Sequence, residues 1–167
     1  MSLSEILNYT PTIHFTQAED ITYLPTQLGS HIVPINDTNQ DIENLDLIIL
    51  GCGEMRGQDA QLEYSQGPDL IRKELYQLHF WHPEMKIGDL GNILQGETIN
   101  DTKAALRSVL TELQHLGKRV LIIGGSHDLT LQQYDVFKSQ QKIIDFSVID
   151  MLVDLNEMAQ TQYHFHN

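Results

Sequence analysis

Three short apolar runs, separated by longer stretches with helical periodicity, dominate the pattern of the chain. They occupy residues 47–50 (LIIL), 120–123 (VLII) and 146–149 (FSVI), and each is followed by Gly or Asp. Short runs of this kind are typical of strands that are buried on both faces of a parallel sheet. The pattern therefore predicts interior strands at these three positions.

The first interval predicts a helix that begins at residues 67–69 (GPD), because proline is favoured in the first turn of a helix. We expect it to end near residues 79–83, and residues 89–93 (DLGNI) then predict a short strand or a turn. Apolar side chains recur along the helix at helical spacing, at Leu70, Ile71, Leu75 and Leu78.

Two further helices are predicted downstream. Asn100 or Asp101 can cap the first, and Gly117 is placed to end it in the left-handed conformation. The second begins near Thr130, which stands at capping-box spacing from Gln133. The first of the two also carries an apolar stripe that should face the core, made of Leu106, Val109, Leu110, Leu113 and Leu116.

Alternating strands and amphipathic helices predict an α/β fold with a mainly parallel sheet and right-handed crossovers. Residues 1–44 are polar and acidic, contain Pro11, Pro25 and Pro34, and lack a sustained period. We expect them to form an N-terminal extension that lies on the domain, pinned by some of its apolar side chains, or else a disordered tail. Residues 45–167 form the domain itself.

The net charge of the chain argues against two classes of binding partner. The 167 residues include 10 Lys and Arg against 23 Asp and Glu, a net charge of −13, and no Lys or Arg precedes Arg56. Binding to nucleic acid or to an anionic membrane needs clustered basic side chains, so neither partner is expected. No apolar run approaches the roughly 18 residues of a membrane-spanning helix, and the early part lacks the basic segment of a targeting signal. A cytoplasmic protein is predicted, and the single cysteine, Cys52, agrees with a reducing compartment.

Candidate chemistry lies just after the predicted strands, where open α/β sheets bind their ligands. Residues 124–128 (GGSHD) follow the second apolar run, and residues 150–155 (DMLVDL) follow the third. His127, Asp150 and Asp154 can converge at this edge as ligands for a divalent metal. The alternative is structural: His127 stabilises its loop by hydrogen bonding, and the two aspartates accept bonds from backbone amides.

The same segments resemble motifs of the ureohydrolase family, which comprises the arginases, agmatinases and formimidoylglutamases. Residues 124–128 resemble the Gly-Gly-x-His motif, and residues 150–154 (DMLVD) resemble the Asp-x-His-x-Asp motif. Residues 67–72 (GPDLIR) are similar to the Gly-Pro-x-x-Ile-Arg helix start, and residues 89–92 (DLGN) to the Asp-Leu-Gly segment. The resemblance spans residues 46–155 and favours the formimidoylglutamase branch.

The resemblance implies a three-layer α/β/α, arginase-like fold, of which this chain is the N-terminal half. It also implies a manganese-dependent hydrolase of carbon–nitrogen bonds in small guanidino or formimino substrates, in which two metal ions make hydroxide available near neutral pH. By position, His127, Asp150 and Asp154 match ligands of one metal, and Asp150 also matches a bridge to the second.

Leu152 stands where the second metal's histidine is expected, and a leucine side chain has no lone pair to donate. At most one manganese site is therefore predicted, and the family's later Asp-x-Asp motif has no counterpart here. We expect the chain to be an incomplete or inactive hydrolase by itself; the alternative is a non-catalytic binding or scaffold protein with the arginase fold.

Other candidate sites receive simpler interpretations. Residues 51–53 (GCG) resemble a dinucleotide-binding turn, but Arg56 replaces the third glycine, so no organic cofactor is expected. Cys52 is predicted to be a small buried side chain. A half-domain leaves an unpaired sheet edge and an uncovered apolar face, which predicts a homo-oligomer. The remaining candidates are interpreted as surface histidines: His79, His82, His164 and His166.

Overall fold

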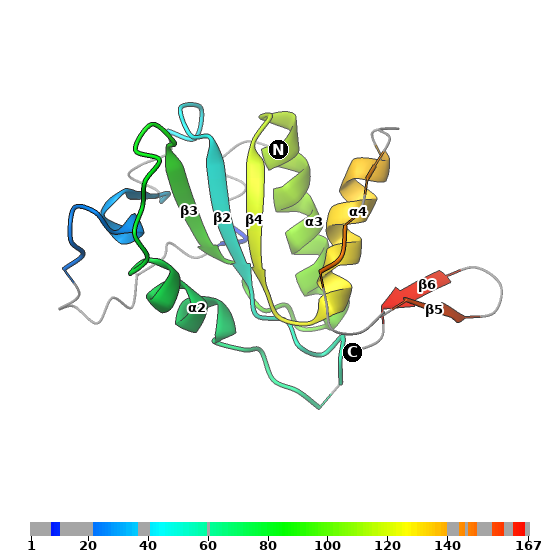
Figure 1. The fold of residues 1–167 in the computed structure, drawn as a ribbon. Coiled ribbons are helices and arrows are strands. Elements are labelled where there is room, and N and C mark those ends of the chain that lie inside the picture. The colour runs from blue at the N-terminus through cyan, green and yellow to red at the C-terminus, as the bar shows by residue number, and fades with distance from the viewer. Residues whose placement is uncertain are drawn as a thin grey trace.

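The computed structural model describes residues 8–10, 22–36, 41–59, 61–139, 144–145 and 147–149, together with the backbone of residues 155–158 and 162–165. Figure 1 shows the arrangement of the elements. In chain order they are the 3-10 helix η1 (Leu28–Ser30), β1 (Ile32–Pro34), β2 (Leu47–Cys52), α2 (Gly67–Leu75), β3 (Ile87–Asn92), α3 (Ile99–His115), β4 (Arg119–Gly124), the 3-10 helix η2 (His127–Leu129), α4 (Thr130–Ser139), β5 (Leu155–Met158) and β6 (Gln162–Phe165).

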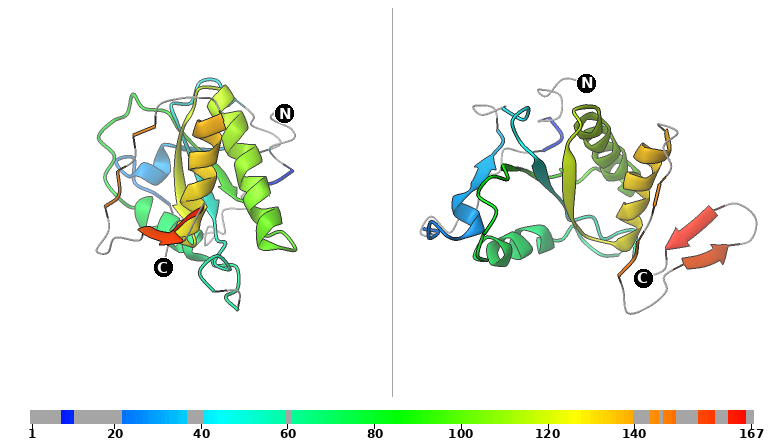
Figure 2. Two further views of the ribbon diagram at one scale, coloured as in Figure 1. Left: turned by 90° about the vertical axis from the view of Figure 1, so that its right-hand side faces the viewer. Right: turned by 45° about the horizontal axis from the view of Figure 1, so that its top comes forward.

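A four-stranded sheet in the order β1-β3-β2-β4 forms the middle layer, and every neighbouring pair in it is parallel. Leu47 of β2 lies opposite Ile87 of β3 on one side and Arg119 of β4 on the other. Helices α3 and α4 cover one face of this sheet, and α2 lies on the opposite face (Figure 2). The predicted α/β class with a parallel sheet is confirmed, and β5 and β6 form a separate antiparallel pair.

The alternation of side chains along β2 divides the core between the two faces. Ile48, Leu50 and Cys52 pack in the cluster beneath α3 and α4, whereas Ile49 belongs to the cluster on the side of α2. Successive residues of a strand point to opposite faces, so one buried strand supplies both clusters. The predicted stripe of α3 is confirmed at four positions, Leu106, Val109, Leu110 and Leu113, whereas Leu116 is exposed.

The ends of α3 and the start of α4 agree with the sequence prediction only in part. Thr98 is the N-cap of α3 and forms a capping box with Asp101, so the cap lies earlier than either predicted residue. Gly117 ends the helix with a φ of 70°, as predicted. The capping box predicted at Thr130 is wrong, because η2 begins at His127 and runs directly into α4.

Two predicted elements differ from the structure. Residues 147–149 are described but do not form a strand, and Val148 and Ile149 are exposed; Phe146 lies outside the described residues. A strand needs a neighbour to satisfy its backbone, and no described strand lies beyond β4. Helix α2 ends at Leu75, short of residues 79–83, and buries Arg72 while most of its predicted apolar positions, including Leu70 and Ile71, stay exposed.

The N-terminal part contributes an edge strand to the sheet. Strand β1 pairs with β3, with Val33 opposite Gly88, and the segment before it lies against the α2 side of the core. Of the apolar residues that could pin this segment, Leu28, Ile32 and Val33 pack on the core, whereas Leu24 is exposed. The boundary between residues 44 and 45 stays a prediction.

Candidate functional site

The turn after β4 brings His127 to the carboxyl edge of the sheet. Its position depends on Gly125, where a Cβ atom would lie 2.2 Å from the carbonyl oxygen of Glu54. Ser126 follows and donates its backbone N–H to the same carbonyl at 2.8 Å, and its hydroxyl oxygen lies 3.1 Å from that carbonyl oxygen. The turn is therefore held against the loop after β2, and the next side chain, His127, is exposed.

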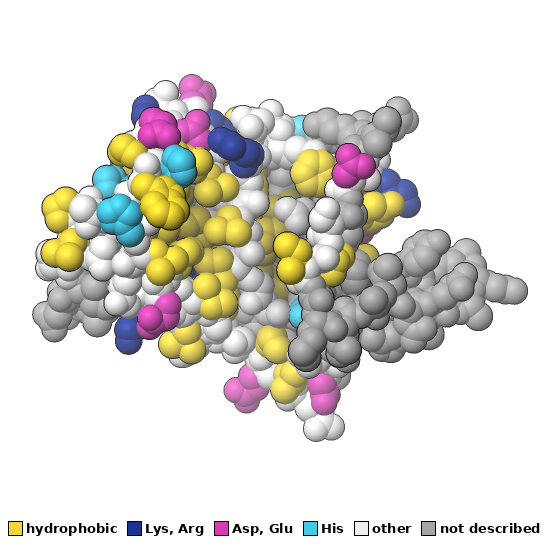
Figure 3. Space-filling view, in the orientation of Figure 1, with side chains coloured by type: hydrophobic (Ala, Val, Ile, Leu, Met, Phe, Trp, Pro, Cys, Tyr) yellow, Lys and Arg dark blue, Asp and Glu magenta, His cyan; other side chains and the backbone are white. Residues whose placement is uncertain are grey.

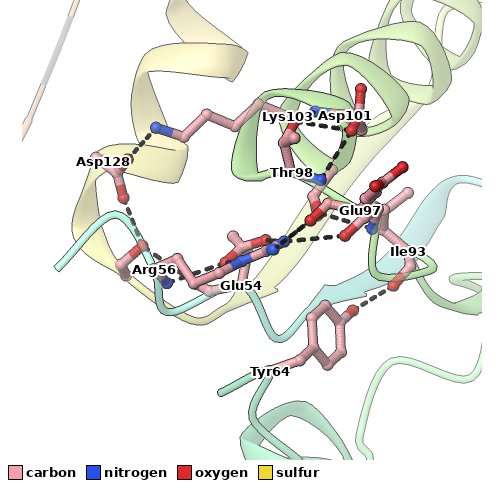
Figure 4. A network of polar contacts seen from close by, with 12 residues as sticks. Glu54, Arg56, Tyr64, Ile93, Glu97, Thr98, Asp101, Lys103 and Asp128 are labelled. Carbon is pink, nitrogen blue, oxygen red and sulfur yellow. Dashed lines mark hydrogen bonds and ion pairs between the residues drawn. The ribbon is translucent and has the colours of Figure 1, made fainter. Parts of the chain in front are cut away.

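An open groove of about 450 Å³ runs beside β4 and reaches His127. Asp128, the next residue, is not a candidate ligand, because its carboxylate is already bound within the protein. It forms an ion pair with Lys103 and accepts a hydrogen bond from the Ser126 hydroxyl (Figure 4). Of the described residues, no three His, Cys, Asp or Glu side chains form a group that could hold a metal ion.

Only one of the predicted metal ligands can be placed. His127 lies at the carboxyl edge, as the strand-end argument expects. Asp150 and Asp154, and also Leu152, lie outside the described residues. The convergence of the two aspartates with His127 stays a prediction.

Beside this turn lies an ion pair between a buried glutamate and a partly exposed arginine, which the sequence argument missed. Glu54 is fully buried, and Arg56 donates to its two carboxylate oxygens, from Nε at 2.8 Å and from Nη2 at 2.6 Å. Arg56 also donates to the carbonyl oxygen of Glu97 at 3.0 Å and to the hydroxyl of Thr102 at 3.2 Å (Figure 4). The pair thus fastens the loop after β2 to the start of α3.

The environment fixes the charge of Glu54. Burial by itself would raise the pKa of this carboxyl, but hydrogen bonds from the side chain and backbone of Arg56 outweigh it and lower the pKa from 4.5 to about 2. The pair offers no proton donor or acceptor near neutral pH. A glutamate two residues after the end of a strand, with an arginine two residues further on, was the only signal in the sequence.

We expect the stability of the protein to depend on this carboxylate in acid. Because the folded pKa lies below the unfolded one, Glu54 contributes stability above about pH 4.5 and loses it as pH falls toward 2, on the order of 2–3 kcal/mol by linkage. Urea unfolding of Glu54→Gln between pH 5 and pH 2 should lack this share of the pH dependence. Glu63→Gln, in the same loop but exposed, should keep it, and identical profiles for Glu54→Gln and the wild type would contradict the assignment.

A second buried pair joins two of the family-like motifs. Arg72 of α2 donates to both carboxylate oxygens of Asp89 in β3, at 2.7 and 3.1 Å, and to the carbonyl oxygen of Gly91 at 2.9 Å. The hydroxyl of Tyr76 donates to the same carboxylate. Burial would lower the pKa of Arg72, but the charge of Asp89 raises it, so the guanidinium stays protonated. The arginine and the aspartate of these motifs therefore hold α2 on the sheet.

The remaining candidates follow the simpler interpretations. Cys52 is buried, and burial raises the pKa of its thiol to about 11, so it is a poor nucleophile. His79 stacks edge-on against Trp81, and His82 lies 3.2 Å from Glu84 at the surface. The side chains of His164 and His166 lie outside the described part. Among the described residues, no helix is both long and apolar enough to cross a membrane.

A parallel sheet between helices, with a Gly-Gly-Ser-His turn at its carboxyl edge, defines an α/β protein that places polar groups where such sheets bind ligands. The family model described as the Arginase family matches residues 45–166. The chain belongs to the arginase family.

Formimidoylglutamases are among its curated relatives. The chain is 30% identical to the formimidoylglutamase of Klebsiella pneumoniae subsp. pneumoniae over 87 residues. These residues are 50% of this chain and 27% of the relative. The formimidoylglutamase of Photorhabdus laumondii subsp. laumondii is 30% identical over 102 residues, 58% of this chain and 31% of the relative. The chain therefore spans less than a third of the length of these relatives.

Solved structures of the arginase superfamily share the fold. An arginase superfamily protein from Trypanosoma cruzi superposes with a TM-score of 0.56 at 19% identity, over 68% of this chain and 40% of that one. The formiminoglutamase of Trypanosoma cruzi with Mn²⁺ gives 0.53 at 19% identity, over 61% and 38%. The described residues thus form part of the arginase-type fold.

Proposed function

We propose that this chain is a ureohydrolase-like protein of the formimidoylglutamase branch, directed at carbon–nitrogen bonds of formimino or guanidino compounds. The observation that carries this proposal is the place of His127, at the carboxyl edge of the sheet on a Gly-Gly turn within the family's motif. Membership of the arginase family and the similarity to formimidoylglutamases support it.

The proposed cofactor is manganese at a single site. His127 would supply the imidazole ligand, and Asp150 and Asp154 would supply carboxylate oxygens, a donor set that suits a divalent ion. A bound manganese ion would supply a Lewis acid that makes water a nucleophile near neutral pH. Gly125 and Ser126 position the imidazole, because they hold the turn against the carbonyl of Glu54. Leu152 cannot contribute to a second site.

Binding is the direct test of this site. We expect Mn²⁺ titration of the purified chain, followed by calorimetry, to show one site, and His127→Ala to abolish the heat. His115→Ala, which removes an exposed histidine at the far end of α3, should bind like the wild type. No heat with the wild type, or equal heat with His127→Ala, would contradict the proposed metal site.

The same chain is proposed to be incomplete as a catalyst. Neither urea from guanidino substrates nor formamide from formimino substrates should be released in the presence of Mn²⁺, because Leu152 removes one ligand. Turnover would contradict this part of the proposal. The second candidate function, a non-catalytic arginase-fold scaffold, is favoured by Leu152 and predicts that Mn²⁺ does not bind at all.

A further inference from the structure

The ion pair between Lys103 and Asp128 joins the beginning of α3 to the turn that carries His127. Its two side chains are 19% and 13% exposed, so both charges lie largely out of water. A shielded pair of this kind is screened less by salt and water than a pair at the surface. It therefore constrains the residue that directly follows His127.

Three segments that are far apart in the sequence meet at the carboxylate of Asp128. Lys103 of α3 contacts one oxygen, and the hydroxyl of Ser126 donates to the other (Figure 4). The loop after β2 approaches with its backbone, because a Cβ atom on Gly57 would lie 2.2 Å from Asp128 Oδ1. Ser126 and Asp128 flank His127, so these contacts constrain the chain on both sides of the imidazole.

Backbone hydrogen bonds hold the same turn at two further points. The N–H of Ser126 donates to the carbonyl oxygen of Glu54 at 2.8 Å, and the N–H of Leu129 donates to the carbonyl oxygen of Ser126 at 3.1 Å. The side chain of Leu129 is buried in the core cluster beneath α3 and α4. The ion pair adds a charged anchor in α3 to these contacts.

The charge of Lys103 by itself would not favour a cation at this edge of the sheet. Asp59 and Glu63 are exposed in the loop after β2, and Figure 3 shows acidic side chains at the lower end of the molecule, where that loop lies in Figure 1. Carboxylates attract a divalent cation, whereas an ammonium group repels it. Any favourable effect of Lys103 on metal binding must therefore come from the position that it gives to His127.

We propose that Lys103 is a positioning residue for the metal site: through Asp128, it fixes the turn from which His127 presents its imidazole. This inference rests on the proposed manganese site at His127. The ion pair has a second consequence, since a carboxylate that is bound to Lys103 does not compete with the neighbouring imidazole as a ligand.

The first test needs no metal. Lys103→Met removes the charge and keeps an unbranched side chain, so we expect amide hydrogen exchange of the full chain to become about tenfold faster at Ser126 and Leu129, as the turn opens locally. Lys103→Arg keeps the charge and should leave both rates near those of the wild type. The amide of Leu113, in the core of α3, should change much less. Unchanged exchange in the turn, or an equal acceleration at Leu113, would overturn the proposal.

The second test separates position from charge by Mn²⁺ calorimetry. Lys103→Met removes a positive charge and Asp128→Asn a negative one, so charge alone predicts tighter binding for the first and weaker binding for the second. Positioning predicts that both bind about tenfold more weakly, or worse. Arg107→Met is the matched control, because it makes the same change of charge one turn further along α3 and breaks the half-exposed pair with Asp135 at 3.8 Å. It should bind like the wild type.

The two tests also distinguish this inference from the proposed function. If the wild type gives no heat with Mn²⁺ while Lys103→Met still loosens the turn, the proposed metal site is wrong, but the ion pair is confirmed as the contact that positions His127. If the wild type binds Mn²⁺ and Lys103→Met binds it equally well or more tightly, the metal site is supported and the positioning role is wrong.

Discussion

Replacing Arg72 with leucine should destabilise the protein by about 3–5 kcal/mol, the usual cost of leaving a buried charge without its partner. Asp89 is fully buried and accepts two hydrogen bonds from Arg72, so the substitution strands a carboxylate between α2 and β3. The hydroxyl of Tyr76 and the backbone N–H of Gly91 would remain as its donors. Urea unfolding at pH 7 measures the change.

Two further variants separate charge from packing in this experiment. Lys73→Leu, on the exposed side of the same helix, should change the free energy of unfolding by less than about 0.5 kcal/mol. Arg72→Leu/Asp89→Leu removes both charges and should recover part of the loss, as buried pairs often do when replaced together. If Arg72→Leu behaves like Lys73→Leu, the pair has no structural role.

Gly125→Ala should cost about 3 kcal/mol or more, because it forces an atom into backbone that cannot rotate away. The added Cβ would lie 2.2 Å from the carbonyl oxygen of Glu54 and within 2.9 Å of its backbone nitrogen. The turn that carries His127 would have to move off the loop after β2. We therefore expect loss of stability together with loss of any Mn²⁺ binding.

The neighbouring glycine provides the control. At Gly124 the nearest atom to a Cβ is Leu129 Cδ1 at 4.0 Å, so Gly124→Ala should fold and bind like the wild type. Thermal unfolding and Mn²⁺ calorimetry of both variants, side by side, test this difference. Equal melting temperatures for the two would show that the close approach at Gly125 does not hold the turn.

Sequence alone predicted the fold where a local pattern was enough. The apolar runs at residues 47–50 and 120–123 became β2 and β4. Burial on both faces, which the pattern predicts, holds for β2, whereas β4 lies at the edge of the described sheet and exposes Leu121. The run at residues 146–149 carries the same pattern, yet its described residues stay outside any sheet. A strand also needs a neighbouring strand to pair with and a layer of side chains to cover it. The residues of the strand itself do not show whether either is present.

The site was predictable in the same partial way. His127 could be placed because the carboxyl edge of a parallel sheet follows from the order of strands and loops. The ion pair of Glu54 and Arg56 could not be predicted, because Arg56 also binds Glu97 and Thr102, which lie more than 40 positions further along the chain. Likewise, nothing near Asp89 indicates that its partner is Arg72.

The contact between Arg72 and Asp89 changes how the motifs around them should be interpreted. Both motifs lie within the residues that the arginase family model matches. Their charged side chains, Arg72 and Asp89, bind each other and hold α2 on β3. A descendant that abandons hydrolysis would still need this fastening to keep its shape. The two motifs therefore indicate family membership and fold. Whether the chain can catalyse hydrolysis depends on its metal ligands instead.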